Sequence, residues 1–127
     1  MDGVHNFNTG HVFKVMLTNA APVNTNQVYG DLTDLGTAGG YTAGGTVTTT
    51  ATSTTTGTAK VTATDVVFTA TVAGIGPFEY AVLYNTTPTT PLKPLIAWWD
   101  YGSSISLLDG ETFTVDFDNV AGIFTIA

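Results

Sequence analysis

Alternating apolar and polar residues predict β-strands throughout this chain. The clearest example is Thr112–Asp118, in which Phe113, Val115 and Phe117 are separated by single polar residues. A period of two places these three side chains on one face of a strand, whereas a helix would scatter them around its axis. The segment therefore predicts a strand with one buried and one solvent-exposed face.

Runs rich in β-branched and aromatic residues predict the other strands, and no segment has the pattern of a helix longer than one turn. About eight strands with short connections predict an all-β fold, namely a single-domain antiparallel β-sandwich or jelly roll. The predicted strands are Val12–Thr18, Thr46–Thr56, Thr58–Ala63, Val66–Val72, Phe78–Tyr84, Leu95–Tyr101, Ser104–Leu108, Thr112–Asp118 and Ile123–Ile126.

The segment Phe78–Tyr84 has the composition of a central strand. Its even-numbered residues are aromatic or valine and share one face, whereas Ala81 and Leu83 lie on the other. Because both faces are apolar, we expect cover on both sides. We expect this strand to pair with Leu95–Tyr101, so that the two form the aromatic centre of the domain.

The connections carry recognisable turn signals. Val23–Leu35 is polar and irregular, which predicts a long ordered connection with one helical turn at Asp31–Leu35. Gly39–Gly45 places Tyr41 between two glycine pairs, as expected where the backbone turns sharply between sheets and a tyrosine anchors the turn. Gly74–Pro77 predicts a break between strands. The dipeptide Asp109-Gly110 predicts a tight turn.

The segments Thr46–Thr56 and Thr58–Ala63 predict a hairpin with few large side chains. Nearly all their residues are Thr, Ala, Val or Ser. The pairing register is therefore weakly specified, and we expect the hairpin to lie at a sheet edge or to be completed by a partner subunit.

Composition supports one folded domain over residues 1–127. That length suits a single hydrophobic core, and the chain contains no cysteine. Its 26 threonines favour strands over helices, while 11% aromatic residues argue against disorder.

Charge excludes two classes of partner. The formal net charge is −7, there is no arginine, and Lys14, Lys60 and Lys93 are far apart in sequence. Nucleic-acid binding draws on clustered basic residues, and anionic membranes repel an acidic surface. No apolar run approaches the ~20 residues of a membrane span. We therefore expect a soluble protein made in the cytoplasm that binds neither nucleic acid nor membranes.

The candidate chemistry is sparse, and we predict that the protein is not an enzyme. The only histidines are His5 and His11, in the polar lead, and no serine lies in a nucleophile-elbow motif. Their spacing does not match that of a helical zinc pair. Nothing in the sequence brings two acids together across an aromatic-lined groove, as a glycosidase requires. We predict no cofactor and no metal.

Acidic residues near the C-terminus are the strongest candidates for a cation site. Asp116 and Asp118 share a strand face, and Asp109 and Glu111 precede them. The spacing is not that of an EF-hand, and alternating acids usually form the wet face of a strand.

Trp98, Trp99 and Tyr101 are candidates for an aromatic platform that binds a sugar or a protein. Adjacent residues on a strand face opposite sides, so the two tryptophans cannot share one layer. The favoured interpretation is that the sheets and their loops cover both indoles, and the alternative is that one lies at an interface.

Five blocks resemble a widespread family of small tailed-phage virion proteins. Their order and spacing span nearly the whole chain, although similar chains tend to carry an additional segment before the equivalent of Asp2–Asn6. The blocks are FKVMLTN at Phe13–Asn19, GYTAGG at Gly40–Gly45, GPFEYAVLYN at Gly76–Asn85, PLIAWWDYG at Pro94–Gly102 and GETFTVDF at Gly110–Phe117.

The resemblance implies a structural role in a bacteriophage virion. Members look like head decoration (cement) proteins, which implies a place on the capsid exterior after synthesis in the host cytoplasm. The implied partners are the major capsid protein and further copies of the chain, as a homodimer or homotrimer. The alternative is a tail or fibre-associated protein that binds a receptor or glycan. The family supplies no catalytic residues.

We expect partner contacts at three places: residues 1–11 as an extended N-terminal arm, the threonine-rich hairpin and the exposed tryptophan. An extended arm or hairpin can add a strand to a neighbouring sheet without demanding particular side chains. The predicted interface residues are Asp2, His5, Phe7, His11, Thr48, Thr50, Thr54, Trp98 and Trp99.

Overall fold

The computed structural model describes residues 11–23, 25–55, 57–88, 92–117 and 124–126, and these contain nine strands, one 3₁₀ turn and no α-helix. No helix in these ranges is long and apolar enough to cross a membrane. The elements are β1 (Phe13–Thr18), η1 (Tyr29–Asp31), β2 (Thr46–Thr48), β3 (Thr50–Thr55), β4 (Thr58–Ala63), β5 (Val66–Thr69), β6 (Ile75–Asn85), β7 (Leu95–Leu107), β8 (Thr112–Val115) and β9 (Phe124–Ile126).

The main sheet has the strand order β2-β1-β6-β7, and every pair in it is antiparallel. β6 lies between β1 and β7, which confirms the prediction of a central strand. Its partners run from Phe13 opposite Asn85 to Thr18 opposite Tyr80 on the β1 side. β2 and β7 form the two edges of this sheet.

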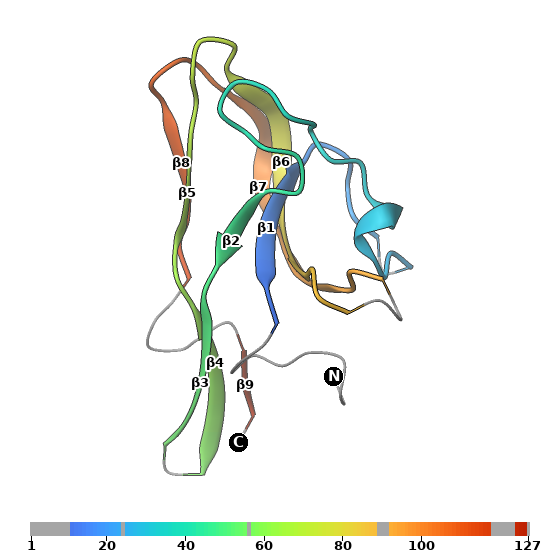
Figure 1. Cartoon of the computed structure of the whole chain (residues 1–127), viewed down its shortest axis with the longest axis vertical. Coiled ribbons are helices and arrows are strands. Elements are labelled where there is room, and N and C mark those ends of the chain that lie inside the picture. Colours follow the sequence, from blue (N-terminus) through green and yellow to red (C-terminus); the bar gives the residue numbers. More distant parts are fainter. Residues whose placement is uncertain (1–10, 24, 56, 89–91, 118–123, 127) are drawn as a thin grey trace.

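The second layer consists of the β5–β8 pair and the three-stranded sheet β3-β4-β9. Figure 1 shows β5 and β8 facing the main sheet, while the β3–β4 hairpin extends beyond it. β2 continues into β3 and β4 into β5, so one long ribbon runs from the main sheet to the projecting hairpin. The chain is an all-β, antiparallel β-sandwich, as the sequence predicts.

Threonine hydroxyls hold the point where this ribbon leaves the main sheet. The Thr48 hydroxyl donates to the Thr64 carbonyl at 2.6 Å, and the Thr64 hydroxyl accepts from the Thr49 N–H at 2.9 Å. The backbone also pairs here, since the Thr64 N–H donates to the Thr49 carbonyl. These bonds satisfy polar groups at the break between the strands, where Thr48 is buried.

The main core lies between the two layers. β1 contributes Phe13, Val15 and Leu17, and the second layer contributes Val61, Val66 and Phe68 from its strands and Phe117 from the segment after β8, among others. The clean alternation predicted for Thr112–Asp118 is confirmed as far as Phe117, because Phe113, Val115 and Phe117 all pack on this core.

A smaller core covers the opposite face of the main sheet. Met16, Val82 and Tyr84 are buried there beneath Tyr29 and Leu32 of the connection that follows β1. The prediction of an ordered connection is confirmed, but its helical turn is at Tyr29–Asp31 and not at Asp31–Leu35.

β6 and β7 differ from the sequence-based predictions in three respects, and irregular pairing between the two strands explains two of them. Pairing between them is irregular around Phe78, so Phe78 packs in the main core with Ala81 and Leu83 rather than with Val82 and Tyr84. β6 begins at Ile75, so the break between β5 and β6 lies at residues 70–74, earlier than the predicted Gly74–Pro77.

β7 likewise runs through the stretch expected to separate two strands. It is continuous from Leu95 to Leu107, and the paired positions jump from Asp100 to Ile105. Ser104–Leu108 is therefore the far part of one bulged strand and not a separate element.

A cluster of hydrogen bonds around the Asp34 carboxylate attaches the connection that follows β1 to the main sheet. Asp34 accepts hydrogen bonds from the Tyr41 hydroxyl at 2.6 Å, the Tyr29 hydroxyl at 2.5 Å and the Gly44 N–H at 2.5 Å. The Tyr41 hydroxyl also accepts from the Leu17 N–H of β1 at 3.1 Å. The Gly39–Gly45 turn is thus anchored by a buried tyrosine, as predicted.

The cluster shifts the pKa values of its members. Burial raises the pKa of the Asp34 carboxyl, but the bonds from Tyr29, Tyr41 and Gly44 outweigh burial and hold it below its usual value. Burial, together with the bond to Asp34, raises the pKa of Tyr41 and of Tyr29. Burial, with a smaller effect of the Asp34 charge, raises the pKa of Tyr84 to about 12.

Replacing Asp34 tests how much this cluster stabilises the fold. We expect Asp34→Asn to lower the free energy of unfolding by about 2 kcal/mol, because it removes charge-assisted hydrogen bonds. Urea denaturation measures the change. The matched control is Asp109→Asn, which removes one charge at an exposed turn. Equal losses in the two variants would contradict a special role for Asp34.

The same carboxylate predicts an acid-sensitive stability difference. A group whose folded-state pKa is depressed stabilises above its unfolded pKa and loses that contribution as pH falls through the folded value. We therefore expect the difference in free energy of unfolding between the parent protein and Asp34→Asn to have its full value at neutral pH. It should decrease below about pH 4. Urea midpoints at several pH values check this. A difference that stays constant from pH 7 to pH 3 would count against it.

Gly45 tests the close approach of the turn to β1. Its φ is +87°, and a Cβ there would lie 1.8 Å from the Val15 carbonyl oxygen. Gly36 has φ +83° and open space around the Cβ position, so it is a matched control. We expect Gly36→Ala to cost about 1 kcal/mol and Gly45→Ala at least about 2 kcal/mol more in thermal unfolding. Equal costs would show that the approach does not constrain the turn.

Candidate functional site

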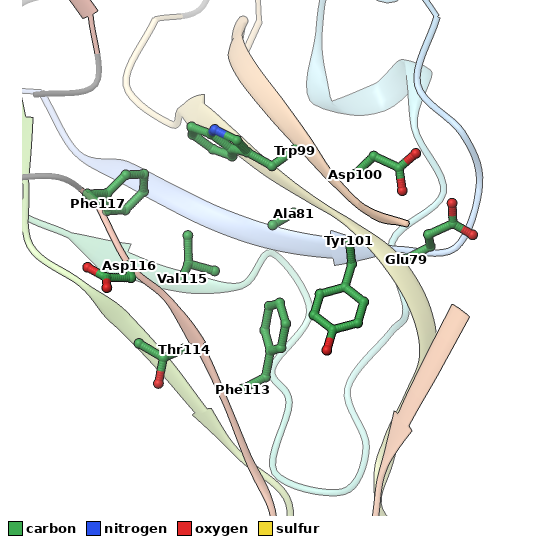
Figure 2. A pocket seen from close by; sticks show the side chains of 10 residues that line it. All are labelled: Glu79, Ala81, Trp99, Asp100, Tyr101, Phe113, Thr114, Val115, Asp116 and Phe117. Carbon is green, nitrogen blue, oxygen red and sulfur yellow. The ribbon is translucent and has the colours of Figure 1, made fainter. Parts of the chain in front are cut away.

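A pocket of about 410 Å³ lies between the edge strands β7 and β8, and we call it the edge pocket. β7 belongs to the main sheet and β8 to the second layer, so the pocket opens where the two layers of the sandwich separate (Figure 2). Its lining residues are Glu79, Ala81, Trp99, Asp100, Tyr101, Phe113, Thr114, Val115, Asp116 and Phe117.

Aromatic rings in edge-to-face contact form its walls. Trp99 meets Phe117 with ring centroids 5.5 Å apart and planes at 70°, and Tyr101 meets Phe113 at 5.7 Å and 67°. Phe113 in turn contacts Phe78 of the main core at 5.0 Å. Such contacts stabilise ring pairs beyond their buried area, so these walls are tied to the core.

Local sequence explains the position of the two β7 aromatics. Trp99 lies opposite Ala81 of β6, whose small side chain leaves room beside the indole. Beyond it the bulge begins: Gly102 has φ +99°, and its N–H donates to the Asp100 carboxylate at 2.7 Å. Trp99 is 38% exposed and Tyr101 58% exposed, so both rings are accessible to a binding partner.

Carboxylates lie at both ends of the edge pocket. Figure 2 shows Glu79 and Asp100 next to each other at one end and Asp116 at the other, with the rings of Trp99, Tyr101 and Phe113 between them. The Glu79 carboxyl can hydrogen-bond to Asp100 only in its protonated form, and this raises the pKa of Glu79. No lysine or histidine is among the lining residues.

This arrangement overturns one sequence-based expectation. From the sequence, we expected no two acids to lie together across an aromatic-lined groove. In the structure, Glu79, Asp100 and Asp116 lie around such a groove. Sequence reasoning missed Glu79 and Asp100 as a pair. Their pairing depends on the irregular register of β6 and β7, for which the sequence carries no direct signal.

The predicted interface residues do not gather at one place. Trp98 and Trp99 are 39% and 38% exposed and adjacent on β7, where Trp98 lies opposite Val82 of the smaller core and Trp99 opposite Ala81 of the main core. The expectation that both indoles are covered is therefore wrong. Trp99 is the one predicted interface residue that lines the edge pocket.

The remaining predicted residues have varied environments. The His11 ring bonds to the amide nitrogen of the buried Asn85 at 2.8 Å, which ties the start of the described chain to the end of β6. The Thr48 side chain is buried and bonds to Thr64 within the chain. Thr50 and Thr54 lie on β3. Asp2, His5 and Phe7 lie outside the described residues.

Metal binding finds no support in the part of the chain that the structure describes. There, no three or more side chains of His, Asp or Glu lie together in a group that could hold a metal ion. Asp118, one member of the candidate acidic set, lies outside the described residues. What the edge pocket offers is therefore aromatic surface and negative charge.

Comparison of the chain with protein-family models, with curated proteins and with solved structures finds no match in any of the three.

Proposed function

We propose that this protein is a structural component of a bacteriophage particle, a decoration protein that binds the major capsid protein on the outside of the head. The proposal starts from the five sequence blocks that resemble small virion proteins and extend from Phe13 to Phe117. The fold supports it by offering surfaces suited to binding.

The observation that carries the proposal is the projecting β3–β4 hairpin. β3 pairs only with β4, whose other side is occupied by β9, so within the described residues the outer edge of β3 has no strand beside it. An open edge of this kind can accept a strand from another chain through backbone hydrogen bonds. Figure 1 shows the hairpin clear of the main sheet, where a neighbour can reach it.

The composition of the hairpin suits such a role. Small β-branched residues form strands but give little core of their own, so a hairpin rich in them gains stability from a partner. Its base is fixed by the bonds between Thr48, Thr49 and Thr64. The hairpin is therefore presented in a defined direction, and no strand among the described residues lies along the outer edge of β3.

A tail or fibre-associated role with glycan binding is the second candidate. The exposed rings of Trp99 and Tyr101 favour it, because aromatic surfaces stack against sugar rings. Copy number separates the two candidates. A shell protein is present in hundreds of copies per particle, whereas a tail component is present in a handful.

Blocking the β3 edge tests the decoration role. Thr52 is exposed on β3, and a lysine there opposes strand addition, as charges do on natural edge strands. We expect Thr52→Lys to lower rebinding to heads stripped of the protein by about tenfold, because the edge no longer accepts a strand. Quantitative gel electrophoresis of the reconstituted particles measures the bound copies.

The matched control is Val72→Lys, which adds the same charge at a residue 88% exposed between β5 and β6. It should rebind like the parent protein. Equal losses in both variants would mean that added charge, and not the strand edge, governs binding. Stripped heads that keep their full heat resistance would refute the stabilising role, and a handful of copies per particle would favour the tail candidate.

A further inference from the structure

We propose that the edge pocket between β7 and β8 binds a lysine or arginine side chain carried on an extended segment of a partner protein. This inference deepens the proposed function and relies on it for the partner being a virion protein. The preference for a cationic side chain follows from the pocket itself.

The charged residues of the edge pocket are all acidic. Glu79, Asp100 and Asp116 line the pocket without any basic residue, and Lys14, Lys60 and Lys93 are not among its lining residues. Glu79 and Asp100 lie next to each other at one end of the pocket (Figure 2), so two negative charges are concentrated there. A cation placed there interacts favourably with both, and the acids select against an anionic group.

The aromatic walls also suit a cationic side chain. The rings of Trp99, Tyr101 and Phe113 lie between the two acidic ends. A guanidinium or ammonium group is attracted to an aromatic face, and the aliphatic stem of Lys or Arg packs against apolar surface. The volume of about 410 Å³ falls within the roughly 300–1,000 Å³ typical of ligand pockets.

The strand edges on either side indicate an extended partner. β7 pairs only with β6 and β8 only with β5, so in the described ranges each has one side without a neighbouring strand. A segment that runs along such an edge bonds through its backbone and inserts every second side chain. One inserted basic residue then occupies the pocket.

The lining favours a cation over a neutral glycan. Sugar hydroxyls are bound by a mixture of donors and acceptors, whereas this lining contains no Asn, Gln, Lys, Arg or His. Its polar side-chain groups are three carboxyl groups, the hydroxyls of Tyr101 and Thr114 and the indole N–H of Trp99, so every charge that it carries is negative. Glycan binding is accordingly an outcome of the experiment that would contradict the proposal.

The experiment titrates isotopically labelled full-length protein with short peptides and follows the amide and indole signals by NMR. The probe is an acetylated five-residue threonine peptide with a central arginine, and the matched peptide has glutamine in its place. We expect the arginine peptide to shift the Trp99 indole N–H and the Phe113 and Val115 amides saturably, and more weakly as salt increases. The glutamine peptide should shift them at least about tenfold less strongly at equal concentration.

Two variants localise the effect. Asp100→Asn should weaken binding of the arginine peptide about tenfold, and Glu79→Gln should weaken it in the same direction. Glu79→Gln leaves intact the hydrogen bond from the Gly102 N–H to Asp100. It therefore still tests the role of the acids in binding should Asp100→Asn disturb the bulge. The control Asp109→Asn, which removes one charge outside the pocket lining, should change the affinity less than about twofold.

Three results would overturn the proposal: equal shifts with the glutamine peptide, equal weakening by Asp109→Asn and Asp100→Asn, or binding of cellotriose at Trp99 without binding of the arginine peptide. The particle assay keeps this test separate from that of the decoration role. Peptide binding without particle binding would leave the pocket assignment standing and remove the decoration role. Particle binding without peptide binding would do the reverse.

Discussion

A single carboxylate, Asp34, ties together the parts that make this sandwich possible. β6 is apolar on both faces, and Met16 of β1 adds to the face that carries Val82 and Tyr84, so the fold is stable only if each face is covered. One face is covered by the second layer, but the other depends on an irregular connection with little secondary structure. Asp34 fixes that connection through the hydroxyls of Tyr29 and Tyr41.

Tyr41 carries this constraint from one layer to the other. Its hydroxyl bonds to Asp34 and to the backbone of β1, while its ring packs at 5.7 Å from Phe68 of β5. One side chain therefore links the connection, the main sheet and the second layer. In a chain without cysteine, such a buried polar anchor supplies the local order that a disulfide gives in other small β-proteins.

Much of the fold could be predicted from the sequence because strand periodicity is a local property. The alternation at Thr112–Asp118, the central position of β6 and the buried tyrosine of the glycine-rich turn all follow from side-chain type and spacing. The face of Phe78 could not be predicted, since a bulge changes the alternation without leaving a mark on composition. The two tryptophans were correctly assigned to opposite faces, but the extent of their cover depends on neighbouring strands.

The candidate site was predictable only in part for the same reason. Trp99 is conspicuous in the sequence, whereas the proximity of Glu79 to Asp100 arises from the register of two strands that meet across a bulge. Asp116 and Phe117 join them from another layer, at a separation in sequence that no local pattern encodes. The walls of the edge pocket are therefore a property of tertiary structure.

The continuity of the long ribbon has a mechanical consequence. β2 runs into β3 and β4 runs into β5, so a pull on the hairpin tip is directed along β2, held beside β1, and along β5, held beside β8. Force along a strand loads its ladder of hydrogen bonds together, in shear, and does not peel them apart one at a time. The projecting hairpin is thus attached to the body of the protein in the geometry that best resists tension.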